Sequence, residues 1–173
     1  TAIFVAGPPF TRRSGLAQGF EFSDETVAAR RLFRPFSESI SNFHNWFLEE
    51  PKKPFFALLT VQDLLHPEVV TVTDRGEQRA RNVESLVEEI DESLIHLFTT
   101  LRNAKKWKST TIVVVGIQGR SDPVDPLYRP LQVHPNQTLV PLFIKLREQA
   151  SGNGTVKTKK IEGTWTHAEL GKI

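Results

Sequence analysis

The sequence predicts an α/β protein, a three-layer αβα arrangement built on a mostly parallel sheet. Apolar, β-branched segments that are typical of buried strands alternate with longer segments whose apolar residues recur at helical spacing. One of these strands follows a long amphipathic helix, as the second strand of a βαβ unit does. With right-handed crossovers, such alternation places helices over the faces of a sheet.

Three segments are expected to be neighbouring strands of that sheet: Ala2–Ala6, Pro54–Gln62 and Thr110–Val115. The last is a continuous run of threonine, isoleucine and valine with no charged residue, which is typical of a strand buried on both faces. A further strand is predicted at Thr138–Leu146, where Pro141 indicates an edge position or a strand entrance.

Two helices are predicted to cover the faces of the sheet. Ser37–Glu50 has Ser37 as a candidate N-cap, and Pro51 ends it. His44 lies beside its apolar face, where a structural role is favoured. Glu77–Lys106 has a longer apolar stripe opposite an acidic, solvated face. The apolar residues of the two stripes are Ile40, Phe43, Trp46 and Phe47, and Val83, Leu86, Val87, Ile90, Leu94, Leu97, Phe98 and Leu101.

Composition excludes several classes of function. The 173 residues carry a net charge of only +2, and the basic residues are scattered, so nucleic acid is not an expected partner. The chain has no Cys, hence no disulfide, thiol nucleophile or thiolate metal site. No apolar run reaches transmembrane length and no signal peptide is visible. The sequence also has no Met, and we expect it to be a piece of a longer chain with part of its sheet lacking and apolar surface uncovered near Ala2–Ala6.

Site chemistry is expected just beyond the carboxyl ends of the parallel strands. Asp63 and His66 follow the second strand, where they could bind a substrate anion or orient a neighbouring group. An ordinary loop with an aspartate cap and an exposed histidine is the open alternative. Ile117 and Gln118 follow the strand Thr110–Val115, and neither is a good metal ligand, an acid or a base.

The proline-rich loop from Ser121 to Asn136 contains three residues of types that can bind metals: Asp122, Asp125 and His134. Aspartates in proline-rich loops commonly support turns, so a turn role is favoured over a metal site. The segment Gly19–Phe22 is expected to form a turn with two aromatic rings tucked into a core.

The order of segments resembles the sulfatase branch of the alkaline phosphatase superfamily, over nearly the whole chain. The resemblance rests on seven short motifs taken in order, and no single motif is decisive. They are Thr1–Phe4, like the family's T-A strand; Gly19–Phe22, like G-F-D-x-F; Trp46–Leu48 with Lys53–Phe56, like W-L … K-P-F-F-L; Asp63–Pro67, like D-P-H-x-P; Glu89–Leu94, like v-D-e-x-i-G; Thr111–Val115 with Gly119, like T-I-V-V-F-T-S-D-H-G; and Leu139–Leu142, like r-V-P-L.

The departures from the family pattern bear on function. The family's S-D-H-G supplies two metal ligands, and Ile117 and Gln118 occupy those positions here, so the resemblance implies a degenerate metal site. His66 is the family site residue that the sequence retains, displaced by one position. The family's lysine ahead of V-P-L has no counterpart, and Arg129 is the nearest base. The substrate-binding residues implied by the resemblance are therefore Asp63, His66 and Arg129.

The family's nucleophile and first metal aspartates precede the matching region, so the resemblance implies that residues 1–173 are part of a single sulfatase-like domain without those segments. Two functions stay open. One is a structural or binding role, with no cofactor bound by this chain. The other is a share in a sulfate or phosphate ester hydrolase, with Ca²⁺ or Mg²⁺ held by the parent chain. The partner suggested is the remainder of that chain, and the location is extracytoplasmic by resemblance alone.

Overall fold

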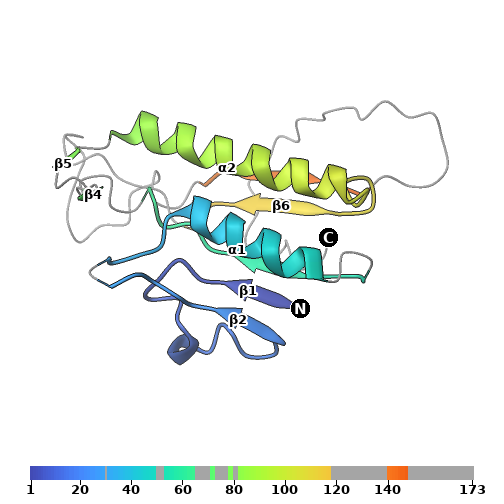
Figure 1. Ribbon diagram of the computed structural model, residues 1–173, viewed down its shortest axis with the longest axis horizontal. Helices are drawn as coiled ribbons and strands as arrows, with labels where there is room; N and C mark the ends of the chain where they lie inside the picture. The colour runs from blue at the N-terminus through green and yellow to red at the C-terminus, as the bar shows by residue number, and fades with distance from the viewer. Residues whose placement is uncertain are drawn as a thin grey trace.

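The computed structural model describes residues 1–29, 31–49, 53–64, 71–72, 78–79, 82–117 and 140–147. This part of the chain is a mixed α/β structure, in which two packed helices lie beside a small parallel sheet (Figure 1). The coarse fold class predicted from the sequence is therefore confirmed.

The parallel sheet has three strands in the order β2-β1-β3. Strand β1 (Ala2–Phe4) is central and pairs in parallel with β2 (Phe22–Asp24) and with β3 (Ala57–Leu59). The predicted parallel pairing of the strands in Ala2–Ala6 and Pro54–Gln62, which are β1 and β3, is confirmed. Strand β2 was not predicted, and only its first residue, Phe22, belongs to the predicted turn Gly19–Phe22. The turn lies just before it, at Gly19, whose φ of +90° is a conformation that favours glycine.

Side chains on β1 alternate between two cores, as the period of two in a strand requires. Ala2 and Phe4 point into a large aromatic core shared with the helices. Ile3 and Val5 point to the opposite face, where Ala17 packs on them together with the partly buried Phe10, Phe20 and Leu58. A short 3-10 helix, η1 (Arg12–Ser14), belongs to the loop that covers this second face.

Helix α1 (Phe36–Glu49) buries one stripe, and its ring-bearing residues pack on Phe4 of the central strand. The predicted N-cap at Ser37 is wrong, since the helix begins at Phe36. Helix α2 (Val83–Asn103) begins at the N-cap Asn82, whose side-chain oxygen accepts a hydrogen bond from the Ser85 N–H at 2.7 Å. The buried apolar residues of the two helices are Phe36, Ile40, Phe43, Phe47, Leu86, Leu97 and Leu101.

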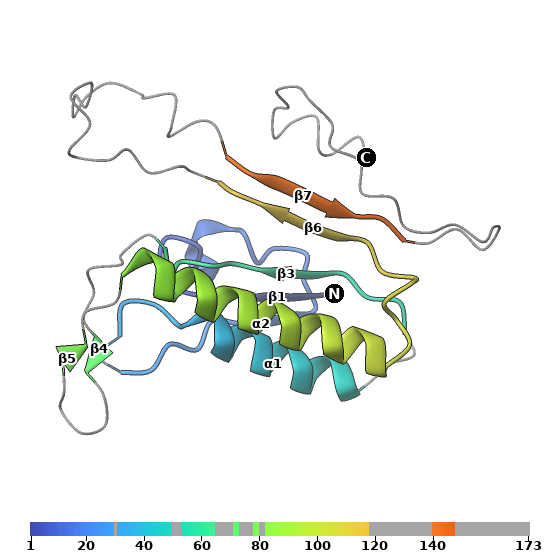
Figure 2. The same ribbon diagram turned by 90° about the horizontal axis from the view of Figure 1, so that it is seen from above.

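Both helices pack on the same face of the sheet (Figure 2). His44 of α1 lies 2.9 Å, through Nδ1, from Thr100 Oγ1 of α2, and the Thr100 hydroxyl itself bonds to the His96 carbonyl. His44 thus lies between the two helices with a hydrogen-bond partner, which agrees with the structural role favoured from the sequence. The prediction that the helices cover both faces is wrong for the described residues. The apolar stripes of α1 and α2 pack against each other and against the same face of the sheet.

Strand β6 (Ile112–Val115) pairs with β7 (Leu142–Lys145) in an antiparallel ladder, in a sheet separate from β1. The predictions that this run neighbours the other two strands and is buried on both faces are wrong for the described residues, since Val113 is 50% exposed. An apolar run specifies a strand but not its ladder partner. The predicted strand around Leu142 is confirmed, with Pro141 at its entrance. Strands β4 (Thr71–Val72) and β5 (Gln78–Arg79) form a further antiparallel pair.

The expected uncovered apolar surface near the start of the chain is not found. Residues Ala2, Ile3, Phe4, Val5 and Ala6 all have 0% exposure. Exposed apolar side chains occur elsewhere in the described structure, among them Phe56 beside β3 and Val113 and Phe143 on the ribbon formed by β6 and β7.

Candidate functional site

The carboxyl edge of the three-stranded parallel sheet is the place where a site is expected. Because β1, β2 and β3 run in parallel, the residues that end or follow them lie at the same edge. Five polar or charged side chains are buried there, and they form what we call the edge cluster. Its members are Asp24, Arg34, Thr60, Gln62 and Asp63.

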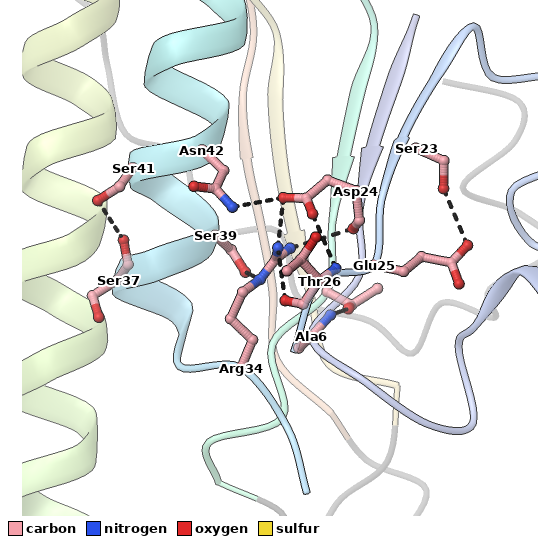
Figure 3. A network of polar contacts seen from close by, with 11 residues as sticks. Ala6, Ser23, Asp24, Glu25, Thr26, Arg34, Ser37, Ser39, Ser41 and Asn42 are labelled. Carbon is pink, nitrogen blue, oxygen red and sulfur yellow. Dashed lines mark hydrogen bonds and ion pairs between the residues drawn. The ribbon is translucent and has the colours of Figure 1, made fainter. Parts of the chain in front are cut away.

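The centre of the edge cluster is an ion pair between Arg34 and Asp24 (Figure 3). The Arg34 Nη1 atom lies 2.5 Å from Asp24 Oδ2, and the side chains are only 1% and 9% exposed. Arg34 Nε also donates to Ser39 Oγ at 3.1 Å, and Asn42 Nδ2 donates to Asp24 Oδ2 at 2.7 Å. The pair therefore ties the end of β2 to the first turns of α1.

The pKa of Asp24 is below its ordinary range. Burial alone would raise this pKa, since it disfavours the charged carboxylate. The hydrogen bonds from the Thr26 N–H and the Asn42 amide, together with the charge of Arg34, outweigh burial. Asp24 is thus a carboxylate held in its charged form, and it is poorly suited to act as a general acid or base near neutral pH.

Two further members of the edge cluster hold the chain that leaves β1. Thr60 Oγ1 accepts a hydrogen bond from the Ala6 N–H at 2.7 Å. Gln62 Nε2 donates to the carbonyl oxygens of Gly7 and Pro8 at 3.2 and 2.7 Å. A Cβ added at Gly7 would lie 3.0 Å from the Leu32 oxygen and 3.2 Å from Gln62 Oε1, and the φ of +153° is one that other residues rarely adopt, so glycine is favoured here.

Asp63 caps helix α1 from a distant part of the chain. The Phe36 N–H donates to both carboxylate oxygens, at 3.3 and 3.2 Å. A carboxylate at this position satisfies an N-terminal backbone donor and interacts favourably with the helix dipole. Asp63 is 4% exposed, so it is placed as a buried cap and not as a side chain that projects into solvent.

The predicted site residues are only partly within the described residues. Ile117 lies after β6 and is 61% exposed. His66, Gln118 and Arg129 lie outside the described ranges, as do the loop residues Asp122, Asp125 and His134. The structure therefore places Asp63 at the carboxyl edge of the parallel sheet and Ile117 at the end of a different sheet.

Asp24 and Arg34 were not singled out from the sequence. They lie ten residues apart in a segment without clear periodicity, and Arg34 was counted only among the scattered basic residues. The one available signal is the apolar and aromatic surroundings of Arg34, between Phe33 and Phe36. Burial of its guanidinium depends on the fold of three separate segments.

Every buried side-chain nitrogen or oxygen in the described ranges has a hydrogen-bond partner. Within the same ranges no group of three or more His, Asp or Glu side chains could hold a metal ion. Nor does any helix described here have the length and apolarity needed to cross a membrane. The edge cluster is a complete polar network whose members hold backbone segments in place.

The fold and this cluster define a mixed α/β protein with a small parallel sheet and a buried polar edge. No family model matches the chain, and neither a curated protein nor a solved structure matches it.

Proposed function

We propose that the chain is part of a sulfatase-like α/β domain, a three-layer αβα arrangement in its complete form, whose metal site is degenerate. Its role is structural or one of binding, and it does not catalyse ester hydrolysis by itself. The observation that carries this proposal is Ile117, an exposed hydrocarbon side chain at the position where the resemblance calls for a metal ligand.

The chemistry of divalent ions supports this proposal. Ca²⁺ takes six to eight oxygen ligands, and Mg²⁺ loses its waters reluctantly. Ile117 offers no donor atom, and the side chain of Gln118 offers one neutral oxygen. One neutral ligand does not offset the dehydration of a divalent ion, so a site built on these two residues would stay weak.

The edge cluster supports the proposal independently. Asp63 stands where the family has an aspartate near its histidine, yet its carboxylate bonds to the N–H of Phe36. Asp24 is paired with Arg34. Using either carboxylate as a ligand would take it from a buried donor, which costs about 1–3 kcal/mol for each unsatisfied group.

The test is calorimetric titration of residues 1–173 with Ca²⁺, Mg²⁺ and Zn²⁺, alongside turnover assays on an aryl sulfate and an aryl phosphate. We expect no saturable binding and no turnover. Asp63→Asn serves as the matched variant, since it keeps a capping oxygen and removes a charged ligand. Stoichiometric micromolar binding that is lost in Gln118→Ala, or turnover abolished by His66→Ala, would establish the hydrolase alternative instead.

A further inference from the structure

Strand β3 uses only one of its two edges in the described structure. The Ala2 N–H donates to the Phe56 oxygen at 2.9 Å, and the Thr60 N–H donates to the Phe4 oxygen at 3.1 Å. Because backbone groups alternate between the two edges of a parallel strand, the N–H and C=O groups of Ala57 and Leu59 point away from β1. No described strand pairs with this outer edge of β3.

Strand β6 also uses only one of its two edges in the described structure. The Gly116 N–H donates to the Pro141 oxygen at 3.0 Å, in line with the ladder that pairs Val114 with Phe143. In an antiparallel pair, the residues between hydrogen-bonded positions turn their backbone groups to the other edge. The N–H and C=O groups of Val113 and Val115 therefore face an edge that no described strand occupies.

Within the described residues, β3 and β6 themselves contain neither a charged side chain nor a proline. The edge strands of natural sheets are usually blunted by charged side chains or proline. The opposite edge of the parallel sheet, at β2, contains Asp24 and is flanked by Glu21 and Glu25, and β7 is flanked by Pro141 and Arg147. No charged residue occurs between positions 54 and 62 or between positions 110 and 117. The edges at β2 and β7 are therefore protected, and the edges of β3 and β6 that no described strand occupies are not.

The two unprotected strands also share a direction and a core. Strand β6 runs the same way as β1 and β3 and lies on the same side of β1 as β3 (Figures 1 and 2). Ala57 and Leu59 of β3 and Ile112 of β6 all pack against the aromatic core beneath the helices. A strand added along these edges would extend that core.

We propose that an uncharged, apolar β-strand from outside residues 1–173 pairs in parallel with β3 and β6 and joins the two sheets. Its backbone would bond to Ala57 and Leu59 on one side and to Val113 and Val115 on the other. Main-chain hydrogen bonds give such strand addition its affinity, and alternate side chains fill the core and set its specificity. This inference deepens the structural part of the proposed function, that the chain belongs to a larger sheet, but it uses backbone edges and no site chemistry, so its test can fail while the metal-site test succeeds.

A second copy of the chain fits these edges less well. The simplest symmetric dimers would pair β3 with β3 or β6 with β6 across the two-fold axis. They would therefore not join β3 to β6 within one molecule. The uncharged character of both edges favours an apolar strand with no charged residue at its centre.

The test is amide hydrogen exchange with and without a synthetic peptide, Lys-Lys-Val-Thr-Val-Thr-Val-Lys-Lys. We expect exchange at Ala57, Leu59, Val113 and Val115 to slow by about tenfold or more at saturating peptide. The same peptide with alternate N-methylated residues cannot form both ladders and should leave these amides unprotected. Absence of protection by the parent peptide, or equal protection by the methylated one, would overturn the proposal.

Two proline variants provide a matched comparison. Val113→Pro removes an N–H that points to the unprotected edge. Ser23→Pro removes one from the outer edge of β2, because Phe22 and Asp24 make the bonds to β1. We expect Val113→Pro to abolish peptide protection at Leu59 and Ser23→Pro to retain it, with the amide of Phe4 as a check that both fold. Equal peptide protection in the two variants would count against the proposal. Protection of these amides without peptide that grows with protein concentration would also count against it, and would indicate that a second copy of the chain occupies the edges.

Discussion

Removing one member of the Arg34–Asp24 ion pair should destabilise the protein strongly. In Arg34→Met, the Asp24 carboxylate stays buried with only the Asn42 amide and the Thr26 N–H as partners. In Asp24→Asn, the guanidinium stays buried and loses its 2.5 Å contact with a charged oxygen. Breaking a buried pair in this way typically costs about 3–5 kcal/mol, and we expect about 3 kcal/mol for each variant.

The double variant separates the charge effect from lost packing. With both charges removed, no uncompensated charge is left in the interior, so the loss should be well below the sum of the two single losses. We expect a coupling free energy of about 2–3 kcal/mol between Arg34 and Asp24, measured by urea unfolding of the four proteins. Fluorescence of Trp46 and Trp107 can follow the transition, since both residues pack against the aromatic core. Single losses below about 0.5 kcal/mol would refute the assignment of a buried pair, because surface pairs give such values.

The same pair predicts a pH dependence of stability. The pKa of Asp24 is lower in the folded protein than its ordinary value of 3.8, so the unfolded chain takes up the proton first as the pH falls. The stabilisation from ionised Asp24 is therefore fully present above that ordinary value and is lost as the pH falls through the folded pKa. In the double variant this part of the acid destabilisation should disappear. An unchanged slope of unfolding free energy with pH would contradict the reasoning.

Three more predictions concern single residues. Lys105 has a φ of +58° just after α2, where the Lys106 N–H bonds to the Leu101 oxygen. Because glycine adopts this conformation without strain, Lys105→Gly should stabilise the protein by about 0.5–1 kcal/mol in thermal unfolding. A loss of stability would contradict this. Gly116→Ala would place a Cβ 2.7 Å from Val140 Cβ and should cost about 1–3 kcal/mol in urea unfolding, whereas a neutral result would refute that close contact. Asp63→Ala should cost about 1 kcal/mol by loss of the cap on α1, and Asp63→Asn clearly less; equal losses would point to a role beyond capping.

The sequence by itself determined the helices and the existence of most strands. Helix α1 was predicted within one residue at each end, because its apolar residues recur at helical spacing and Pro51 follows it. Helix α2 was predicted too long, since the apolar pattern shows a helix but the cap Asn82 sets its start. Such features depend on residues close together in the chain.

Only the tertiary structure decided which strands pair and which polar groups are buried. Strand β2 is too short and too polar to show alternation, and β1 makes it a strand by offering a free edge. Strand β6 carries a strong strand pattern, but nothing in that pattern selects β7 over β3 as its partner. Asp63 becomes a helix cap, and Arg34 a buried cation, because segments 27 and 10 residues away supply their partners. Such hydrogen-bond partners depend on which distant segments the fold brings together, and a local pattern of residue types does not determine that.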